Sequence, residues 1–427
     1  MDSERESQKL SMGTEDRISR LPDMTLVNVL YYLPTKQAVA TSVLSKRWRS
    51  LWALVPRLDF DDSLFLHPQD GDANPVETTV SFMNFVNRVL ILRTYIPEFK
   101  LKCTRYDSFH VNAWILAALR CHVQELDICI TPKPSFKLSY DVFAFQELVY
   151  IKLGRTFVLD VPKSVCLPKL EVLCLDSIEF RDDDSICKLI SSCPVLEELS
   201  VENCGFKNIR VFCVSAPKLK TLIISCSISK KDDYSTRNCV FEIVVDAPAL
   251  ETLFYSDFVA RGYSLGTLQC LHHVGFDVLY RQEGKDICNK RLLDLLFGVA
   301  NSESLALSGF SVMAFSLLKK YFFLPKFNYL TRLLLEVNEY CGPLLTIFLE
   351  NSPNLEILIL DTKEVWRDTE LKWEPPSHVP KCLLLHLKEV VLNGCSEQED
   401  VIKLINYLQE NAKVLNKVSR LPMSPGS

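Results

Sequence analysis

The stretch "CPVLEELSVENC", residues 193–204, shows how most of this chain folds. Its apolar side chains at Leu196, Leu199 and Val201 follow the order apolar-x-x-apolar-x-apolar. Such spacing suits a short strand whose inward side chains stack on an identical unit in the next repeat. Cys204 stands eight positions after the first leucine, where a thiol or amide can hydrogen-bond the turning backbone. We therefore expect this stretch to form one unit of a stacked array.

The same spacing recurs along the chain and predicts an irregular leucine-rich-repeat solenoid, an α/β horseshoe, over residues 96–365. The copies begin at Ile96, Val123, Leu148, Leu170, Leu196, Leu219, Leu250, Leu271, Leu330, Leu355 and Leu387, with a fragment at Leu305 and Leu307. Their period varies around the ~20–29 residues that such repeats need, which indicates insertions. Asn338 and Cys395 occupy the same position after the first leucine as Cys204.

Five copies place a proline two positions before the first leucine, in "LPKL", "CPVL", "APKL", "APAL" and "SPNL" from Leu167, Cys193, Ala216, Ala247 and Ser352. Proline forbids further helix, so it can close one turn of the solenoid before the strand. Outward-facing residues of the strands would line a concave face where such arrays bind partners. The expected substrate-binding residues there are Glu171, Glu198, Lys220, Glu251 and Arg332.

The first sixty residues follow a helical pattern instead. One helix should begin at Pro22 and Asp23 and end before Pro34, with an apolar face that includes Val29, Leu30 and Leu33. The stretch "TSVLSKRWRSLW", residues 41–52, predicts a further helix, because Leu44, Trp48, Leu51 and Val55 follow helical spacing. Three small helices in so short a segment make a marginal core, so this unit should lean on another structure.

Three segments of this region, "LPD" at 21–23, "LPTK" at 33–36 and "SVLSKRWRSLW" at 42–52, resemble the F-box of plant F-box proteins over residues 16–61. The resemblance implies docking on a Skp-type adaptor, which bridges to a cullin and the ubiquitin-transfer machinery. The matching positions would face the adaptor or hold the fold. They are Leu21, Pro22, Val29, Leu30, Leu33, Pro34, Val43, Leu44 and Trp48.

A linker and helix are expected over residues 62–95, with a loop at 61–77 followed by a helix through Phe82 and Leu90. Residues 366–418 predict a strand at 387–392 and a helix at about 397–415. The motifs "VPKCLL" at 379–384 and "YLQENAKVL" at 407–415 resemble the FBD segment that ends many plant F-box proteins. The tail after this helix lacks the apolar pattern of the extra strand expected in that family.

Composition and motifs argue against several classes of function. A net charge of −5 supplies no basic field for nucleic acid or an acidic membrane surface. The N-terminus is polar, no apolar run approaches the ~20 residues that span a bilayer, and the sixteen cysteines include no Cys-x-x-Cys pair. We therefore expect a cytoplasmic or nuclear protein with reduced thiols and no metal site. No phosphate-binding loop, nucleophile elbow or zinc-protease motif is present, so neither catalytic residues nor cofactors are expected.

Together these patterns predict a non-catalytic substrate receptor of a ubiquitin ligase, which would promote transfer to an unknown protein substrate by proximity alone. Two alternatives stay open. Met24 and Thr25 stand where the family often has an acidic residue followed by an apolar one, so the chain could be a leucine-rich-repeat scaffold with a decayed F-box. It could also be a receptor gated by a small molecule.

Overall fold

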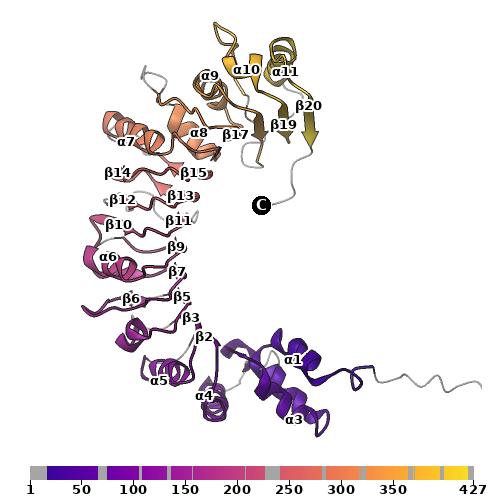
Figure 1. Ribbon diagram of the computed structural model, residues 1–427, viewed down its shortest axis with the longest axis vertical. Coiled ribbons are helices and arrows are strands. Elements are labelled where there is room, and N and C mark those ends of the chain that lie inside the picture. Colours follow the sequence, from indigo (N-terminus) through magenta and orange to yellow (C-terminus); the bar gives the residue numbers. More distant parts are fainter. Residues whose placement is uncertain are drawn as a thin grey trace, which may run out of the picture.

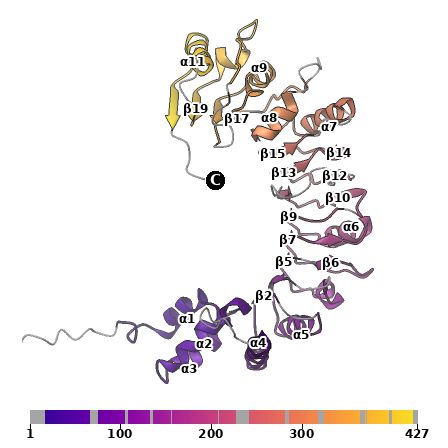
Figure 2. The ribbon, with the colours of Figure 1, turned by 180° about the vertical axis from the view of Figure 1, so that it is seen from behind.

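The chain forms a horseshoe whose inner wall is a parallel sheet and whose outer side carries most of the helices (Figures 1 and 2). This computed structural model describes residues 17–65, 75–104, 108–131, 136–155, 157–206, 208–226, 241–280, 285–316, 318, 324–363, 369, 371–394 and 399–421. A small helical unit projects from one end of the horseshoe. The predicted fold class, a three-helix unit followed by a leucine-rich-repeat solenoid, is confirmed.

Fourteen strands form the main sheet within the described residues. In spatial order they are β1 (Arg57–Asp61), β2 (Glu98–Cys103), β3 (Glu125–Ile130), β5 (Tyr150–Gly154), β7 (Val172–Asp176), β9 (Glu198–Glu202), β11 (Thr221–Ser225), β13 (Thr252–Phe258), β15 (His273–Leu279), β16 (Ser304–Leu307), β17 (Arg332–Glu336), β18 (Ile357–Asp361), β19 (Glu389–Asn393) and β20 (Lys417–Leu421). Equivalent residues lie opposite each other, as Leu199 does with Leu173 and Leu222. Each predicted repeat copy, the fragment at Leu305 included, supplies one of these strands.

Helices and two small sheets cover the outer side (Figure 1). The helices there are α4 (Pro75–Ile91), α5 (Ser108–Leu119), α6 (Asp183–Ser191), α7 (Lys285–Gly298), α8 (Gly309–Ser316), α9 (Cys341–Asn351), α10 (Lys381–Leu385) and α11 (Glu399–Asn411), with the 3-10 turn η4 (Tyr140–Ala144). The small sheets are β4 (Phe136–Lys137), β6 (Phe157–Leu159) and β8 (Glu179–Phe180), and β10 (Val211–Ser215), β12 (Glu242–Asp246) and β14 (Gly262–Leu265). The inward leucines of the main sheet pack with these elements in one continuous core.

The proline-containing turns behave as predicted. The backbone N–H of Leu196 donates to the carbonyl of Cys193 at 3.2 Å, and the same three-residue turn links Leu219 to Ala216 and Leu250 to Ala247. Cys193, Ala216 and Ala247 are buried, and the leucine that follows each turn is buried as well. The turn therefore aims each first leucine into the core just before its strand begins.

The sheet is longer at both ends than the sequence pattern predicted. The expectation that no strand follows the last helix was wrong, since β20 pairs in parallel with β19. As the outermost strand, β20 is mostly exposed, so it tolerates Arg420 where the pattern requires an apolar residue. At the other end β1 opens the sheet, and Val55, Leu58 and Phe60 follow the repeat spacing that the sequence analysis did not count there.

The N-terminal unit consists of α1 (Asp23–Tyr31), α2 (Thr35–Ala40) and α3 (Trp48–Leu51), with 3-10 turns η1 (Thr41–Val43), η2 (Trp52–Leu54) and, beyond β1, η3 (Asp62–Phe65). The predicted helical stripe was wrong at Leu44, which is exposed, while Trp48, Leu51 and Val55 are buried. The reason is that the helix does not run through this stretch: η1 ends at Val43 and α3 begins only at Trp48. The predicted loop at 61–77 was wrong at both ends, since η3 covers Asp62–Phe65 and α4 begins at Pro75, and its residues 66–74 lie outside the described residues.

Candidate protein-docking surfaces

The N-terminal helical unit has its own small core. Leu26, Val27 and Leu30 of α1 pack against Trp48 and Leu51 of α3. Arg47 also hydrogen-bonds the residues at and just before the start of α1. Its guanidinium donates to the Asp23 carboxylate at 2.6 Å, to the Ser19 carbonyl at 2.8 Å and to the Leu21 carbonyl. The core and these polar contacts therefore hold the unit together without its exposed apolar side chains.

The structure divides the nine predicted adaptor-facing residues by burial. Leu30 and Trp48 are buried in the small core, and Leu21 and Leu33 pack against it. Pro34 is half-buried and stands directly before α2. The exposed members are Pro22, Val29, Val43 and Leu44.

Three of these exposed residues have aliphatic side chains that would ordinarily be buried. Val43 is 87% exposed, Leu44 64% and Val29 52%. Met24, Tyr32 and Leu54 are exposed on the same unit but were not among the predicted residues. Their apolar character at positions off the buried helix face was the signal that could have identified them. Exposed apolar side chains gathered on a small unit are typical of a protein-binding surface.

A set of polar contacts fixes this unit to the solenoid. The Tyr31 hydroxyl donates to Glu98 of β2 at 2.7 Å, and the backbone N–H of Asp59 donates to the Thr35 hydroxyl at 2.7 Å. The Lys36 ammonium donates to the Leu64 carbonyl at 2.6 Å and lies 4.1 Å from the centre of the Phe65 ring.

Arg93, which follows α4 and is only 7% exposed, adds a buried cation to these contacts. Its guanidinium donates to the carbonyls of Trp52, Ala53 and Val55, at the end of the helical unit. Burial lowers the pKa of Arg93. Four carbonyl groups, that of Tyr95 included, thus converge on one buried cation.

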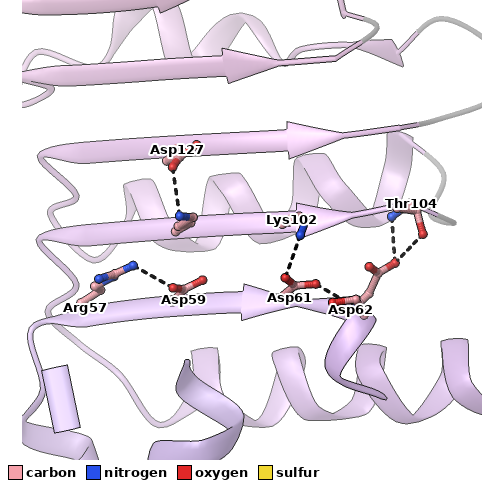
Figure 3. A network of polar contacts seen from close by, with 9 residues as sticks. Arg57, Asp59, Asp61, Asp62, Lys102, Thr104 and Asp127 are labelled. Carbon is pink, nitrogen blue, oxygen red and sulfur yellow. Dashed lines mark hydrogen bonds and ion pairs between the residues drawn. The ribbon is translucent and has the colours of Figure 1, made fainter. Parts of the chain in front are cut away.

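On the inner face of the first three strands, charged side chains neutralise one another (Figure 3). Arg57 pairs with Asp59 at 2.7 Å, Lys102 with Asp61 at 3.1 Å and Lys100 with Asp127 at 3.6 Å. The hydrogen bond that Lys102 donates to the Asp61 carboxylate raises the pKa of Lys102. At this end of the inner face, these acidic and basic side chains therefore form ion pairs with each other.

The five predicted substrate-binding residues are all exposed, but they do not share one position in the repeat. Glu198 and Arg332 are the first residues of β9 and β17. Glu171, Lys220 and Glu251 each stand one residue before a strand, at the edge of the sheet. Lys220 pairs with Glu197 at 2.7 Å, and this hydrogen bond raises the pKa of Lys220.

The buried cysteines of the repeat turns, Cys193 and Cys204, have unreactive thiols. The Ile178 N–H donates to the Cys204 sulfur at 3.4 Å, as predicted for the turning backbone, while Cys395 lies outside the described residues. Burial raises the pKa of Cys193 and of Cys204 to about 12, so both thiols stay protonated at neutral pH. Within the described ranges, no group of three or more His, Cys, Asp or Glu residues could hold a metal ion.

A small helical unit followed by a leucine-rich-repeat horseshoe is the architecture expected of an F-box protein with leucine-rich repeats. Family models agree: an F-box domain matches residues 18–60, the LRR repeats of the FBD-associated F-box protein At5g56370 match residues 111–268, and FBD matches residues 374–419. None of the helices in the described part of the chain has the length and apolar character to cross a membrane.

Full-length relatives identify the family. F-box/LRR-repeat protein At3g59190 of Arabidopsis thaliana is 34% identical over 404 residues, which cover 89% of this chain and 97% of that protein. F-box/LRR-repeat protein At3g59200 of the same plant is 36% identical, and the match covers 81% of this chain and 69% of that protein. The putative FBD-associated F-box protein At5g53635, also from this plant, is 31% identical, and the match covers 94% of each chain. The chain belongs to this family of F-box/LRR-repeat proteins.

Family membership sets the general role. Proteins that join an F-box to leucine-rich repeats are in general non-catalytic substrate adaptors of ubiquitin ligases of the Skp, cullin, F-box type. The F-box generally binds a Skp-type adaptor, and the repeats mediate protein interaction.

Proposed function

We propose that this chain is the substrate-recognition subunit of a Skp, cullin, F-box ubiquitin ligase. Its N-terminal unit docks on a Skp-type adaptor, and through it on a cullin. Its repeats recruit a target protein for ubiquitination. The chain forms no bond itself, because its contribution is to hold the target near the ubiquitin carrier.

One observation carries the proposal: Val43 and Leu44 stay exposed although the small core of the unit is complete without them. Burying a large aliphatic side chain gains about 1.5–3 kcal/mol, so a partner that covers Val43, Leu44 and Val29 recovers a sizeable free energy. Pro22 stands directly before α1 and is exposed as well. We place the adaptor contact on these four residues and assign Leu30 and Trp48 to holding the fold.

The joint, by which we mean the polar contacts between the N-terminal unit and the first strands, supports the proposal that the repeats present a target protein to the ligase. Tyr31, Thr35 and Arg93 fix the docking unit to the first strands of the solenoid. A target held on the concave face would then keep a constant orientation relative to the adaptor. A constant orientation is what catalysis by proximity requires.

Titration calorimetry with a purified Skp-type adaptor tests the proposal. We expect micromolar or tighter binding by the full chain and its loss in the double variant V43D/L44D. The control is I402D, which places one Asp on an exposed apolar residue of α11, and V43D alone is the variant of equal charge. Wild-type affinity in V43D/L44D would remove these residues from the adaptor contact, and no binding by the folded wild-type chain would favour a leucine-rich-repeat scaffold.

A further inference from the structure

The concave face changes character halfway along the horseshoe. In the middle position of the strands, the first four residues are Asp59, Lys100, Asp127 and Lys152, which alternate in charge. From β11 to β19 the same position is occupied only by apolar residues or glycine, and the outermost strand β20 has Ser419 there. We call this set the apolar row: Ile223, Phe254, Gly275, Ala306, Leu334, Ile359 and Val391.

Apart from Ile359, the apolar row does not belong to the core. The core side of each strand is filled by the alternate residues, such as Leu333 and Leu335 of β17, which are fully buried. Leu334 between them is only partly buried, and Phe254 is 39% exposed. Ile359, with 5% exposure, is the most covered member of the row.

Gly275 lets the Phe254 ring lie along the row. A Cβ atom at Gly275 would come within 2.8 Å of Cδ2 of Phe254, so the ring occupies the space above the glycine. A side chain at Gly275 would push the ring off the face. The local sequence thus leaves a large aromatic surface exposed where a polar residue would have been the ordinary choice.

Carboxylates run beside the apolar row, two residues further along the strands. We call Asp277, Glu336 and Asp361 the acidic row. Asp277 accepts hydrogen bonds from Ser256 and Ser308, and Glu336 accepts one from the N–H of Gly309 at 2.8 Å. Asp361 pairs with Lys363 at 3.4 Å, whereas neither Asp277 nor Glu336 has a Lys or Arg within salt-bridge distance among the described residues.

Electrostatics on this flank favour an incoming cation. Burial raises the pKa of Glu336, and the neighbouring Asp277 and Asp361 add to the rise, while the Gly309 N–H and the Lys363 ammonium oppose it without cancelling it. A positive group placed beside these carboxylates would relieve their mutual repulsion. The first strands differ, because their acids are already paired with Lys and Arg of the same face.

We propose that the apolar row binds a segment of the target protein that carries apolar side chains together with Lys or Arg. The apolar side chains would cover Phe254 and Leu334, and the cations would face the acidic row. Seven strands about 4.8 Å apart give a row roughly 29 Å long, which an extended segment of roughly nine residues spans. This inference rests on the proposed function and names the chemistry of its substrate.

Labelled peptides of that length test the inference by fluorescence anisotropy on the full chain bound to its adaptor. Three probes are compared: leucine with arginine, leucine with glutamate, and serine with arginine. We expect the leucine–arginine peptide to bind at least about tenfold more tightly than either of the others. Tighter binding of the leucine–glutamate peptide would overturn the inference and point to an acidic partner. Equal binding of the serine–arginine peptide would also overturn it, because simple charge attraction would then suffice.

Variants locate the binding. L334S and the double variant E336Q/D361N should each weaken the leucine–arginine peptide about tenfold. K152S and E202Q change the same two positions in the first half of the face, and they should leave the affinity unchanged. Thermal melting and adaptor binding are measured on each variant. If these stay at wild-type values while L334S and E336Q/D361N bind the peptide normally, the inference fails and the adaptor role stands.

Discussion

The phenol oxygen of Tyr31 donates a 2.7 Å hydrogen bond to the carboxylate of Glu98, so the last turn of the first helix is joined to the second strand of the solenoid. Arg57 lies over the same ring, 5.6 Å from its centre. The hydrogen bond to Glu98 raises the pKa of Tyr31. These contacts lie between the helical unit and the repeats, where the Arg93 guanidinium is also buried.

Replacing Arg93 by methionine should lower the free energy of unfolding by about 2–3 kcal/mol, because carbonyl groups that now bond to a buried cation lose their donor. Urea denaturation measures the change. Arg88, exposed on α4, supplies the control, and R88M should stay within about 0.5 kcal/mol of wild type. Equal effects of the two variants would show that the buried contacts do not stabilise the joint.

Trp48 and Val43 should separate fold from binding. W48A empties a buried position in the small core and should cost roughly 3–5 kcal/mol of stability in that unit. V43D alters a side chain that is 87% exposed and should leave thermal melting unchanged while weakening adaptor binding. A large loss of stability in V43D would contradict the division of roles.

Asn338 should be critical to one repeat. Its side chain is fully buried, donates to the Gly309 carbonyl at 2.7 Å and accepts from the Tyr340 N–H at 2.9 Å. N338A leaves both backbone groups without partners and should cost about 1–3 kcal/mol in urea denaturation. N301A, at an exposed position, is the matched control. A neutral N338A would show that water replaces the amide.

Gly342 should tolerate no side chain. A Cβ atom there would lie 2.6 Å from the Leu371 carbonyl oxygen, a backbone atom that cannot move aside alone. G342A should therefore destabilise the contact between α9 and residues 371–372 by about 1–3 kcal/mol. Gly205, whose nearest neighbour would be 3.7 Å away, offers the comparison variant G205A for the same denaturation experiment. If G342A were as stable as G205A, this close approach would not constrain the fold.

Glu336 should make stability depend on pH. Its pKa in the folded chain is raised by burial, so folding favours its neutral form. The stability that this provides is fully present below its ordinary pKa and is lost as pH rises through the raised value. E336Q should therefore melt at a higher temperature than wild type at pH 7, with the difference closing below pH 4. A difference that does not change with pH would contradict this origin.

Much of the fold follows from the sequence because every repeat needs three apolar side chains that point into the core. Leu199 and Leu222 meet this requirement and lie opposite each other. The outermost strand escapes prediction since one of its sides has no neighbour, which relaxes the requirement at Arg420. Leu44 was misplaced because periodicity alone does not show where a short helix breaks.

The binding surfaces were harder to predict for a different reason. Phe254 and Leu334 are far apart in sequence and become parts of one row only through the pairing of four strands. A single copy of the repeat contains no information about that row. The residues predicted to face the adaptor could be grouped from sequence, but only burial separates Val43 from Trp48.

The parallel pairing of the inner sheet has a consequence for how such a protein changes over evolutionary time. Each strand contacts only its two neighbours, and the residues of the apolar row are not the ones that fill the core. Mutations at Ile223, Ala306 or Val391 can therefore accumulate one at a time without disturbing Arg93 or Tyr31 at the far joint. A gene encoding this architecture can change the chemistry of one line of concave-face positions while the helical unit at the other end is inherited unaltered.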